Sequence, residues 1–260
     1  MWTFGEHGDE IRRGGEAEKK LIVGAGEFAR LRLGIQLDAL QMELLQSGAH
    51  RGILNCSRQW GKSTVAAIRA VHHAYTYESS LVLVASPSRR QSGELLAKVR
   101  PMLEKLGIAA CGDGINVPSA VLPNGSRIVA LPGSEDTIRG FSAVSLLLID
   151  EAARVSDTIH KTLRPMLAVL NGDLWLMSTP NGKRGFFYEE WEHGGPEWYR
   201  VNAAATECPR IGSEFLEEER SSLGAEWFRQ EYLCEFVDDG TMLFSRELVE
   251  AAIDYDLEPI

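Results

Sequence analysis

The sequence predicts an α/β fold with a mostly parallel sheet that is covered by helices on both faces, followed by a small helical C-terminal subdomain. Three observations lead to this prediction. Apolar runs typical of strands buried on both faces alternate with segments of helical periodicity. One helical segment begins with Gly-Lys-Ser-Thr at 61–64, and one apolar run ends in Asp-Glu at 150–151. Strand–helix alternation of this kind is typical of parallel sheets.

The expected elements follow one another in chain order. The expected helices cover residues 37–48, 63–75, 91–107 and 157–172, and the expected strands cover 51–57, 79–88, 144–152, 172–182 and 197–205. Residues 120–131 contain an Asn-Gly pair between apolar residues, which indicates a β-hairpin. Pro101 lies inside the third helix, where it is expected to produce a kink.

Composition divides the chain into three parts. Residues 1–25 are rich in glycine and charge and have no period, so we expect a flexible N-terminal arm. Residues 26–210 form the predicted α/β core. Residues 211–260 are acidic and helical, and they are expected to form a small subdomain or a linker toward a further domain.

Charge and cysteine content limit the function classes. The net charge of −10 means that any contact with DNA must come from a local basic patch. The four cysteines (Cys56, Cys111, Cys208 and Cys234) have no metal-ligand spacing, which favours a reducing compartment and no metal site built by the protein alone. No apolar run approaches the roughly 18 residues that span a bilayer, so no membrane partner is expected.

The loop at 56–63 predicts a phosphate site of the P-loop NTPase class. Phosphate-binding loops read G-x-x-x-x-G-K-[ST] between a strand and a helix, and both flanking elements are predicted here. Lys62 would contact the β- and γ-phosphates of ATP, and the Ser63 hydroxyl would bind Mg²⁺. Cys56 stands where the first glycine is usual, and Arg58 lies inside the loop. The alternative is a plain polar turn between strand and helix.

Two further strand ends carry polar residues. Asp150 is placed to hold Mg²⁺ through water, and Glu151 to orient or deprotonate the attacking water. The alternative for this pair is the N-cap of a helix. Ser178, Thr179 and Asn181 would lie beside the phosphates, unless they form only a Pro-Asn-Gly turn. Carboxyl ends of parallel strands meet at one edge, so these groups are expected to converge.

Together these motifs resemble the ATPase portion of the large terminase subunit of tailed bacteriophages, over residues 37–236. The family's loop reads S-R-Q-x-G-K-[ST], so its arginine matches Arg58, whereas Cys56 departs from a frequent glycine. The resemblance implies nucleotide contacts from the loop residues Ser57, Arg58, Gln59, Trp60, Gly61, Lys62, Ser63 and Thr64. For Trp60, packing is the favoured alternative.

The resemblance also implies roles for residues outside the loop. Gln41 would read the adenine edge, unless it is an exposed helix residue. Arg58 and Arg139 would stabilise charge on the γ-phosphate, with Arg139 as an arginine finger, unless Arg139 only pairs with Glu135 or Asp136 on the surface. Residues 178–182 match the motif that couples hydrolysis to motion.

The implied function is an ATP-hydrolysing motor that moves double-stranded DNA into a procapsid in the host cytoplasm. Expected partners are the DNA, the portal protein, the small terminase subunit and further copies in a ring, with a monomer in isolation as the alternative. The family's nuclease domain is not expected in this portion. A helicase-like ATPase and a nucleotide-gated scaffold without turnover are the competing functions. A single nucleotide-binding sheet argues against the first, and Glu151 against the second.

Two basic patches are candidates for DNA contact. One consists of Lys183 and Arg184, directly after the coupling motif, and the other of Arg89, Arg90, Lys98 and Arg100. The alternative for both is an ordinary solvated surface.

Overall fold

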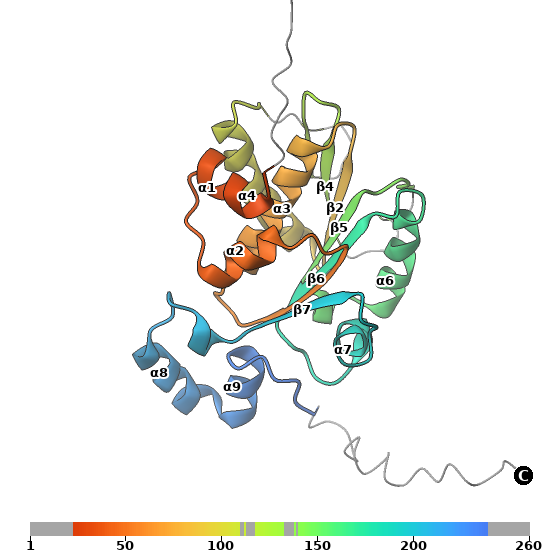
Figure 1. Ribbon diagram of the computed structural model, residues 1–260. Coiled ribbons are helices and arrows are strands. Elements are labelled where there is room, and N and C mark those ends of the chain that lie inside the picture. The colour runs from red at the N-terminus through yellow and green to blue at the C-terminus, as the bar shows by residue number, and fades with distance from the viewer. Residues whose placement is uncertain (1–22, 110–111, 113–117, 133–137, 139, 239–260) are drawn as a thin grey trace, which may run out of the picture.

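A computed structural model describes residues 23–109, 112, 118–132, 138 and 140–238. Its centre is a seven-stranded sheet with the order β3-β4-β2-β5-β6-β1-β7 (Figure 1). Every neighbouring pair is parallel except β3 and β4, which form the predicted antiparallel hairpin. The strands are β1 (Arg51–Cys56), β2 (Leu81–Ser86), β3 (Ser119–Val121), β4 (Arg127–Pro132), β5 (Leu146–Asp150), β6 (Asp173–Ser178) and β7 (Trp198–Ala203).

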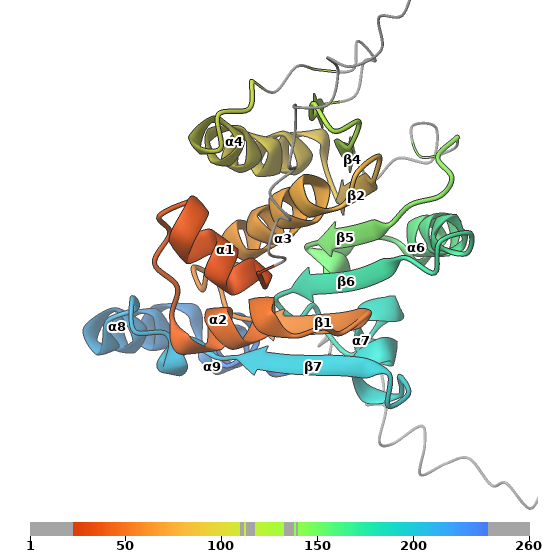
Figure 2. The same cartoon turned by 45° about the horizontal axis from the view of Figure 1, so that its top comes forward.

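Helices cover both faces of this sheet, which confirms the predicted fold class (Figure 2). One face carries α1 (Ala25–Arg32), α2 (Ala39–Gln46), α3 (Lys62–Thr76) and α4 (Arg89–Lys105), and the other carries α6 (Asp157–Leu163) and α7 (Gly185–Glu192). Three short 3₁₀ turns follow the strands and helices: η1 (Ala152–Arg154), η2 (Arg164–Leu167) and η3 (Ala205–Glu207). No helix in the described part of the chain is long and apolar enough to cross a membrane.

Successive strand residues point into two different cores. In β1, Leu54 belongs to the core under α3 and α4, whereas its neighbour Ile53 belongs to the core under α6 and α7. Both side chains are completely buried. This pattern explains why the strands read as continuous apolar runs rather than alternating ones.

The helices differ from the expectations in two places. The helix predicted over 157–172 ends at Leu163 and continues as the 3₁₀ turn η2, because Pro165 cannot donate a helical hydrogen bond. The helices α1 and α7 were not predicted from the sequence. Pro101 lies inside α4, which is one continuous helix, and the kink expected there stays a prediction.

The C-terminal helices α8 (Ser213–Leu223) and α9 (Ala225–Glu231) form a small layer beside β7 (Figure 1). They pack around Leu216, Phe228 and Tyr232. Backbone and side-chain hydrogen bonds join this layer to the sheet: Ala205 N donates to Tyr232 O at 2.7 Å, and Asn55 Nδ2 donates to Cys234 O at 2.7 Å. Tyr232 and Cys234, just after α9, are therefore fixed to the ends of β7 and β1.

Glycine at position 52 is required by the strand packing. Gly52 lies opposite Trp175 in the pairing of β1 with β6, and a Cβ atom at Gly52 would come within 2.4 Å of the indole ring. We expect Gly52→Ala to lower the free energy of unfolding by about 1–3 kcal/mol, because the buried ring cannot move without overpacking its neighbours. Thermal denaturation will measure the loss. The control is Gly48→Ala, where no atom lies within 4 Å of the added methyl group; equal melting temperatures for the two variants would contradict the steric argument.

Candidate active site

The predicted phosphate-binding loop lies between β1 and α3. Two of its residues, Gln59 and Gly61, have left-handed backbone conformations with φ of 61° and 104°. A side chain at Gly61 would also meet Gln41 Nε2 at 2.9 Å, so glycine is required there. Cys56, in contrast, is the last residue of β1 and has no positive φ. The first glycine of the usual motif is therefore not needed for the backbone of this loop.

The loop and the acidic pair meet at the carboxyl edge of the sheet, as predicted. Only β6 separates β1 from β5, so the residues that follow these two strands come close together. Lys62 Nζ lies 3.0 Å from Glu151 Oε1, and Ser63 Oγ donates to Asp150 Oδ2 at 3.2 Å. Glu151 itself adopts a left-handed conformation with φ of 53°, which is uncommon for a residue with a side chain and is typical of functional sites.

Burial and the neighbouring charges shift the pKa values of Asp150 and Lys62. Burial, together with the neighbouring charge of Glu151, raises the pKa of Asp150, and Lys62 and the hydrogen bond from Ser63 only partly oppose this effect. For Lys62, burial acts to lower the pKa, but the surrounding negative groups, including Glu151 and Asp150, outweigh it and leave the pKa above its ordinary value. The lysine is therefore charged at neutral pH and available to a phosphate.

A cavity of about 530 Å³ opens over these groups. Most of its lining residues are polar or charged, and they are Arg58, Gln59, Gly61, Lys62, Ser63, Thr64, Gln91, Lys98, Glu151, Arg154 and Thr179. Hydroxyl and carboxylate oxygens are the ligands that Mg²⁺ prefers, so the adjacent side chains of Ser63 and Asp150 fit that ion. Backbone N–H groups at the start of α3 and the Lys62 ammonium fit phosphate oxygens.

Arg154 is a residue of this cavity that the sequence analysis missed. Its guanidinium donates to Glu151 Oε2 at 3.2 Å and to Thr179 Oγ1 at 2.9 Å, and it also contacts Glu231 Oε1 at 3.0 Å. Arg154 lies at the end of the 3₁₀ turn η1, three residues after the acidic pair. That spacing brings it back toward Glu151 and was the only signal available in the sequence.

Arg58 occupies the edge of the cavity. Its Nε donates to Glu231 Oε2 at 2.7 Å, and this bond raises the pKa of Arg58 further. More than half of the Arg58 side chain is exposed. The predicted arginine finger, Arg139, lies outside the described residues.

Side chains from outside the loop form hydrogen bonds to its backbone. Gln41 is only 5% exposed, so the alternative of an exposed helix residue is wrong. Its Nε2 donates to Trp60 O at 3.0 Å, and Arg210 donates to the same carbonyl and to Asp38 Oδ2. The Trp60 indole ring is 1% exposed and packs in the core, as the packing alternative expects.

The residues of the predicted coupling motif lie against the segment that follows Glu151. Thr179 accepts a hydrogen bond from Arg154, and Asn181 Nδ2 donates to Ala153 O at 3.3 Å. Ser178 is buried, and its hydroxyl has no partner among the described residues. The end of β6 is thus bonded to the turn that carries the predicted base.

The structure places the residues of the two basic patches in different surroundings. Lys98 is exposed and lines the cavity over Lys62, where its Nζ lies 3.4 Å from Thr64 Oγ1. Arg90 pairs with Glu94 on an exposed face of α4. In the second patch, Lys183 pairs with Asp238 at 3.2 Å, which reduces the positive charge that this patch presents.

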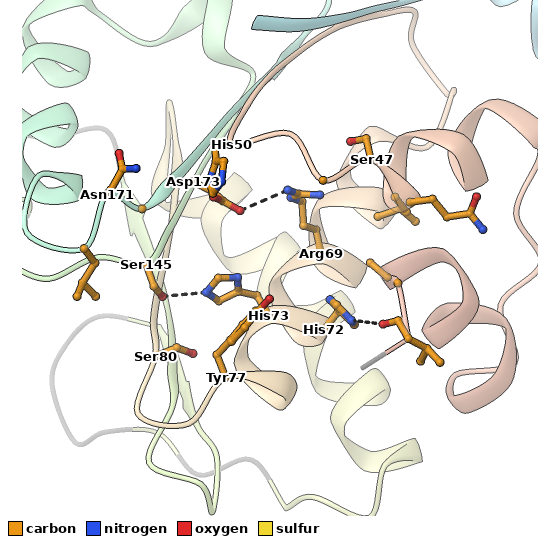
Figure 3. A pocket seen from close by; sticks show the side chains of 18 of the residues that line it. Ser47, His50, Arg69, His72, His73, Tyr77, Ser80, Ser145, Asn171 and Asp173 are labelled. Atoms are coloured by element: carbon orange, nitrogen blue, oxygen red, sulfur yellow. Dashed lines mark hydrogen bonds and ion pairs between the residues drawn. The ribbon is translucent and has the colours of Figure 1, made fainter. Parts of the chain in front are cut away.

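A second cavity, of about 720 Å³, lies at the amino ends of the strands (Figure 3). Asp173 and Ser145 face side chains of α3 there: Asp173 Oδ2 lies 3.5 Å from Arg69, and the Ser145 hydroxyl lies 2.9 Å from His73 Nε2. Burial lowers the pKa of His73 to about 4, so this ring is neutral at physiological pH. Since parallel α/β sheets bind ligands at the carboxyl ends of their strands, the smaller cavity over Lys62 is the candidate active site.

Comparison with known proteins identifies the family. A family profile described as "Terminase large subunit, T4likevirus-type, N-terminal" matches residues 53–251. The chain belongs to the large terminase family. The large terminase subunit of Escherichia phage T5 is 28% identical over 202 residues, which are 74% of this chain and 45% of that protein. The terminase of Thermus virus P23-45 is 24% identical over 82% of this chain and 51% of its own length.

Solved terminase structures share the fold. The large terminase ATPase domain of Thermus phage P74-26 has a TM-score of 0.70 at 23% identity, and the match covers 83% of this chain and all of that domain. The large terminase of the thermophilic bacteriophage D6E in complex with ADP has a TM-score of 0.61 at 12% identity, covering 83% of this chain and 54% of its own. The chain spans about half the length of the curated terminases it matches.

The raised pKa of Asp150 leads to a prediction about stability. A carboxyl group whose pKa is raised on folding lowers stability as the pH rises above its unfolded pKa, and the full penalty is reached once the pH exceeds the raised folded pKa. We expect Asp150→Asn to raise the melting temperature of the nucleotide-free protein at pH 7 while it removes Mg²⁺-dependent stabilisation by ATP. Differential scanning calorimetry between pH 4 and pH 8 will test this. A melting temperature that falls at pH 7 would show that Asp150 is a net stabilising group.

Proposed function

We propose that this chain binds MgATP in the cavity over Lys62 and hydrolyses it. The observation that carries the proposal is the contact between the two motifs: a P-loop lysine and a carboxylate at the end of β5 lie 3.0 Å apart in one cavity. Family membership supports the proposal, and so does the D6E terminase, a relative that was solved with bound ADP.

Each residue has a separate task in this proposal. Lys62 and the N–H groups at the start of α3 bind the β- and γ-phosphates. Ser63 and Asp150 would hold Mg²⁺, which when bound would neutralise negative charge on the phosphates. Lys62 is paired with Glu151 at 3.0 Å, so a phosphate that binds Lys62 competes with this carboxylate. Glu151 is then free to accept a proton from the attacking water.

We further propose that the energy of hydrolysis drives double-stranded DNA into a procapsid. Membership of the large terminase family supports this role. The proposed assembly is a ring of copies that meets the portal protein and the small terminase subunit in the host cytoplasm. The bond from Arg154 to Thr179 supports the proposed coupling, since it joins the residue beside the base to the motif at the end of β6. The alternatives, a helicase-like ATPase and a scaffold without turnover, have no such support.

Two substitutions separate binding from chemistry. We expect Lys62→Ala to weaken ATP binding and abolish hydrolysis, because it removes the positive charge at the phosphates. We expect Glu151→Gln to bind ATP as well as or better than the wild type while turnover falls by at least about 10²-fold, because the base acts only in the chemical step. Nucleotide titration and phosphate release will measure both. Wild-type turnover in Lys62→Ala would rule out the assigned site.

DNA contact is tested by reversing charge in the two patches. We expect Lys183→Glu with Arg184→Glu to weaken binding of duplex DNA of any sequence without changing basal ATP hydrolysis, since a packaging motor contacts phosphates rather than bases. The matched control is Arg89→Glu with Arg90→Glu, which changes the charge equally on α4. Fluorescence anisotropy at several salt concentrations gives the affinities, and their logarithm should fall linearly with log salt. Loss of binding only in the α4 variant would assign the contact to that patch.

A further inference from the structure

A buried carboxylate on α9 contacts both arginines that border the nucleotide cavity. Glu231 Oε2 accepts a bond from Arg58 Nε at 2.7 Å, and Glu231 Oε1 accepts one from Arg154 Nη2 at 3.0 Å. The Glu231 side chain is only 2% exposed, whereas Arg58 and Arg154 reach the surface of the cavity. One carboxylate therefore fixes two cations that line the site.

Local structure alone does not favour a carboxylate at this position. Glu231 is the last residue of α9, and a negative charge at the C-terminal end of a helix is opposed by the helix dipole. A buried charge is also costly unless it is paired. The two arginines supply that pairing, so Glu231 is explained by its contacts with the cavity rather than by its own helix.

The contacts of Glu231 extend to the predicted catalytic base. Arg154 uses the Nη2 atom for Glu231 and the Nη1 atom for Glu151 and Thr179. Because the guanidinium is a rigid plane, the bond to Glu231 restricts the orientation of the bonds to Glu151 and Thr179. The backbone adds a second link, because Arg58 N donates to Glu231 O at 3.2 Å. Next to it, Gln230 Oε1 accepts a bond from Gly182 N, in the turn after the coupling motif.

We propose that Glu231 is a positioning residue for ATP turnover. It holds Arg58 at the edge of the loop and, through Arg154, holds Glu151 in the orientation that the chemical step requires. The C-terminal helices thereby contribute a necessary group to the nucleotide site. This inference rests on the proposed ATPase function.

The test compares Glu231→Gln with Glu235→Gln. Glutamine keeps the shape of the side chain and removes its charge. Glu235 is the matched control, since it lies four residues further on and forms an exposed pair with Arg229 at 2.6 Å, away from the cavity. In steady-state kinetics we expect kcat of Glu231→Gln to fall about tenfold or more with a smaller change in KM, and kcat of Glu235→Gln to stay near that of the wild type.

A comparison of combined variants separates positioning from general stability. If Glu231 acts through its two arginines, then adding Glu231→Gln to a variant that already carries Arg58→Ala and Arg154→Ala lowers kcat by less than about twofold, because both side-chain contacts of Glu231 are already lost. Effects that multiply in the combined variant, or equal kcat values for Glu231→Gln and Glu235→Gln at a temperature well below both melting points, would overturn the proposal.

A measurement without nucleotide tests the contact itself. Cys234 is 4% exposed and lies three residues after the end of α9, and its thiol lies 3.4 Å from Ala203 O. We expect iodoacetamide to modify Cys234 faster in Glu231→Gln than in the wild type or in Glu235→Gln, as measured by mass spectrometry of the peptide. Equal alkylation rates in the three proteins would contradict the proposal that the Glu231 side chain fixes α9 to the loop. A wild-type chain that hydrolyses no ATP would overturn the proposed function, and the alkylation rates would then decide the Glu231 contact separately.

Discussion

A line of five alternating charges holds the candidate site together. It runs from Lys62 to Glu151, Arg154, Glu231 and Arg58, with successive contacts of 3.0, 3.2, 3.0 and 2.7 Å. Each charge has a partner of opposite sign, which makes partial burial of all five tolerable. Both ends of the line are cations that border the cavity, so the function proposed above places a triphosphate in competition with the carboxylates for them.

This line of charges includes residues on both sides of the domain boundary that composition predicts near residue 210. The acidic composition after residue 211 predicts a separate subdomain, and α8 and α9 do have a small core of their own. Yet the side chains of Asn55 and Arg58, at the end of β1 and in the loop, are bonded to the segment around Glu231 and Cys234. The region with the chemistry is thus larger than the sheet and its covering helices.

The sequence allowed the fold and half of the site to be predicted, for a physical reason. Lys62, Ser63, Asp150 and Glu151 all follow strands whose burial on both faces is visible as apolar runs, and parallel strands bring such positions to one edge. Glu231 could not be found in this way. It is one of several acidic residues in two amphipathic helices, and only tertiary packing distinguishes it from its exposed neighbours.

The structure shows contacts of two other residues that the sequence did not indicate. The Gln41 amide group is bonded to the backbone of the loop and to the backbone at the start of its own helix. The Lys98 ammonium lies next to the Thr64 hydroxyl at the start of α3. Both cases depend on the position of a helix relative to the loop, which a single sequence does not record.

Cys56 has a consequence for how such proteins are recognised. The left-handed conformations of this loop fall at Gln59 and Gly61, while Cys56 ends a strand and is completely buried. Position 56 therefore limits the volume of the side chain and does not require the backbone torsion angles of glycine. Small apolar residues should replace one another there freely during evolution, and a signature search that demands glycine at this position will overlook functional members of the family.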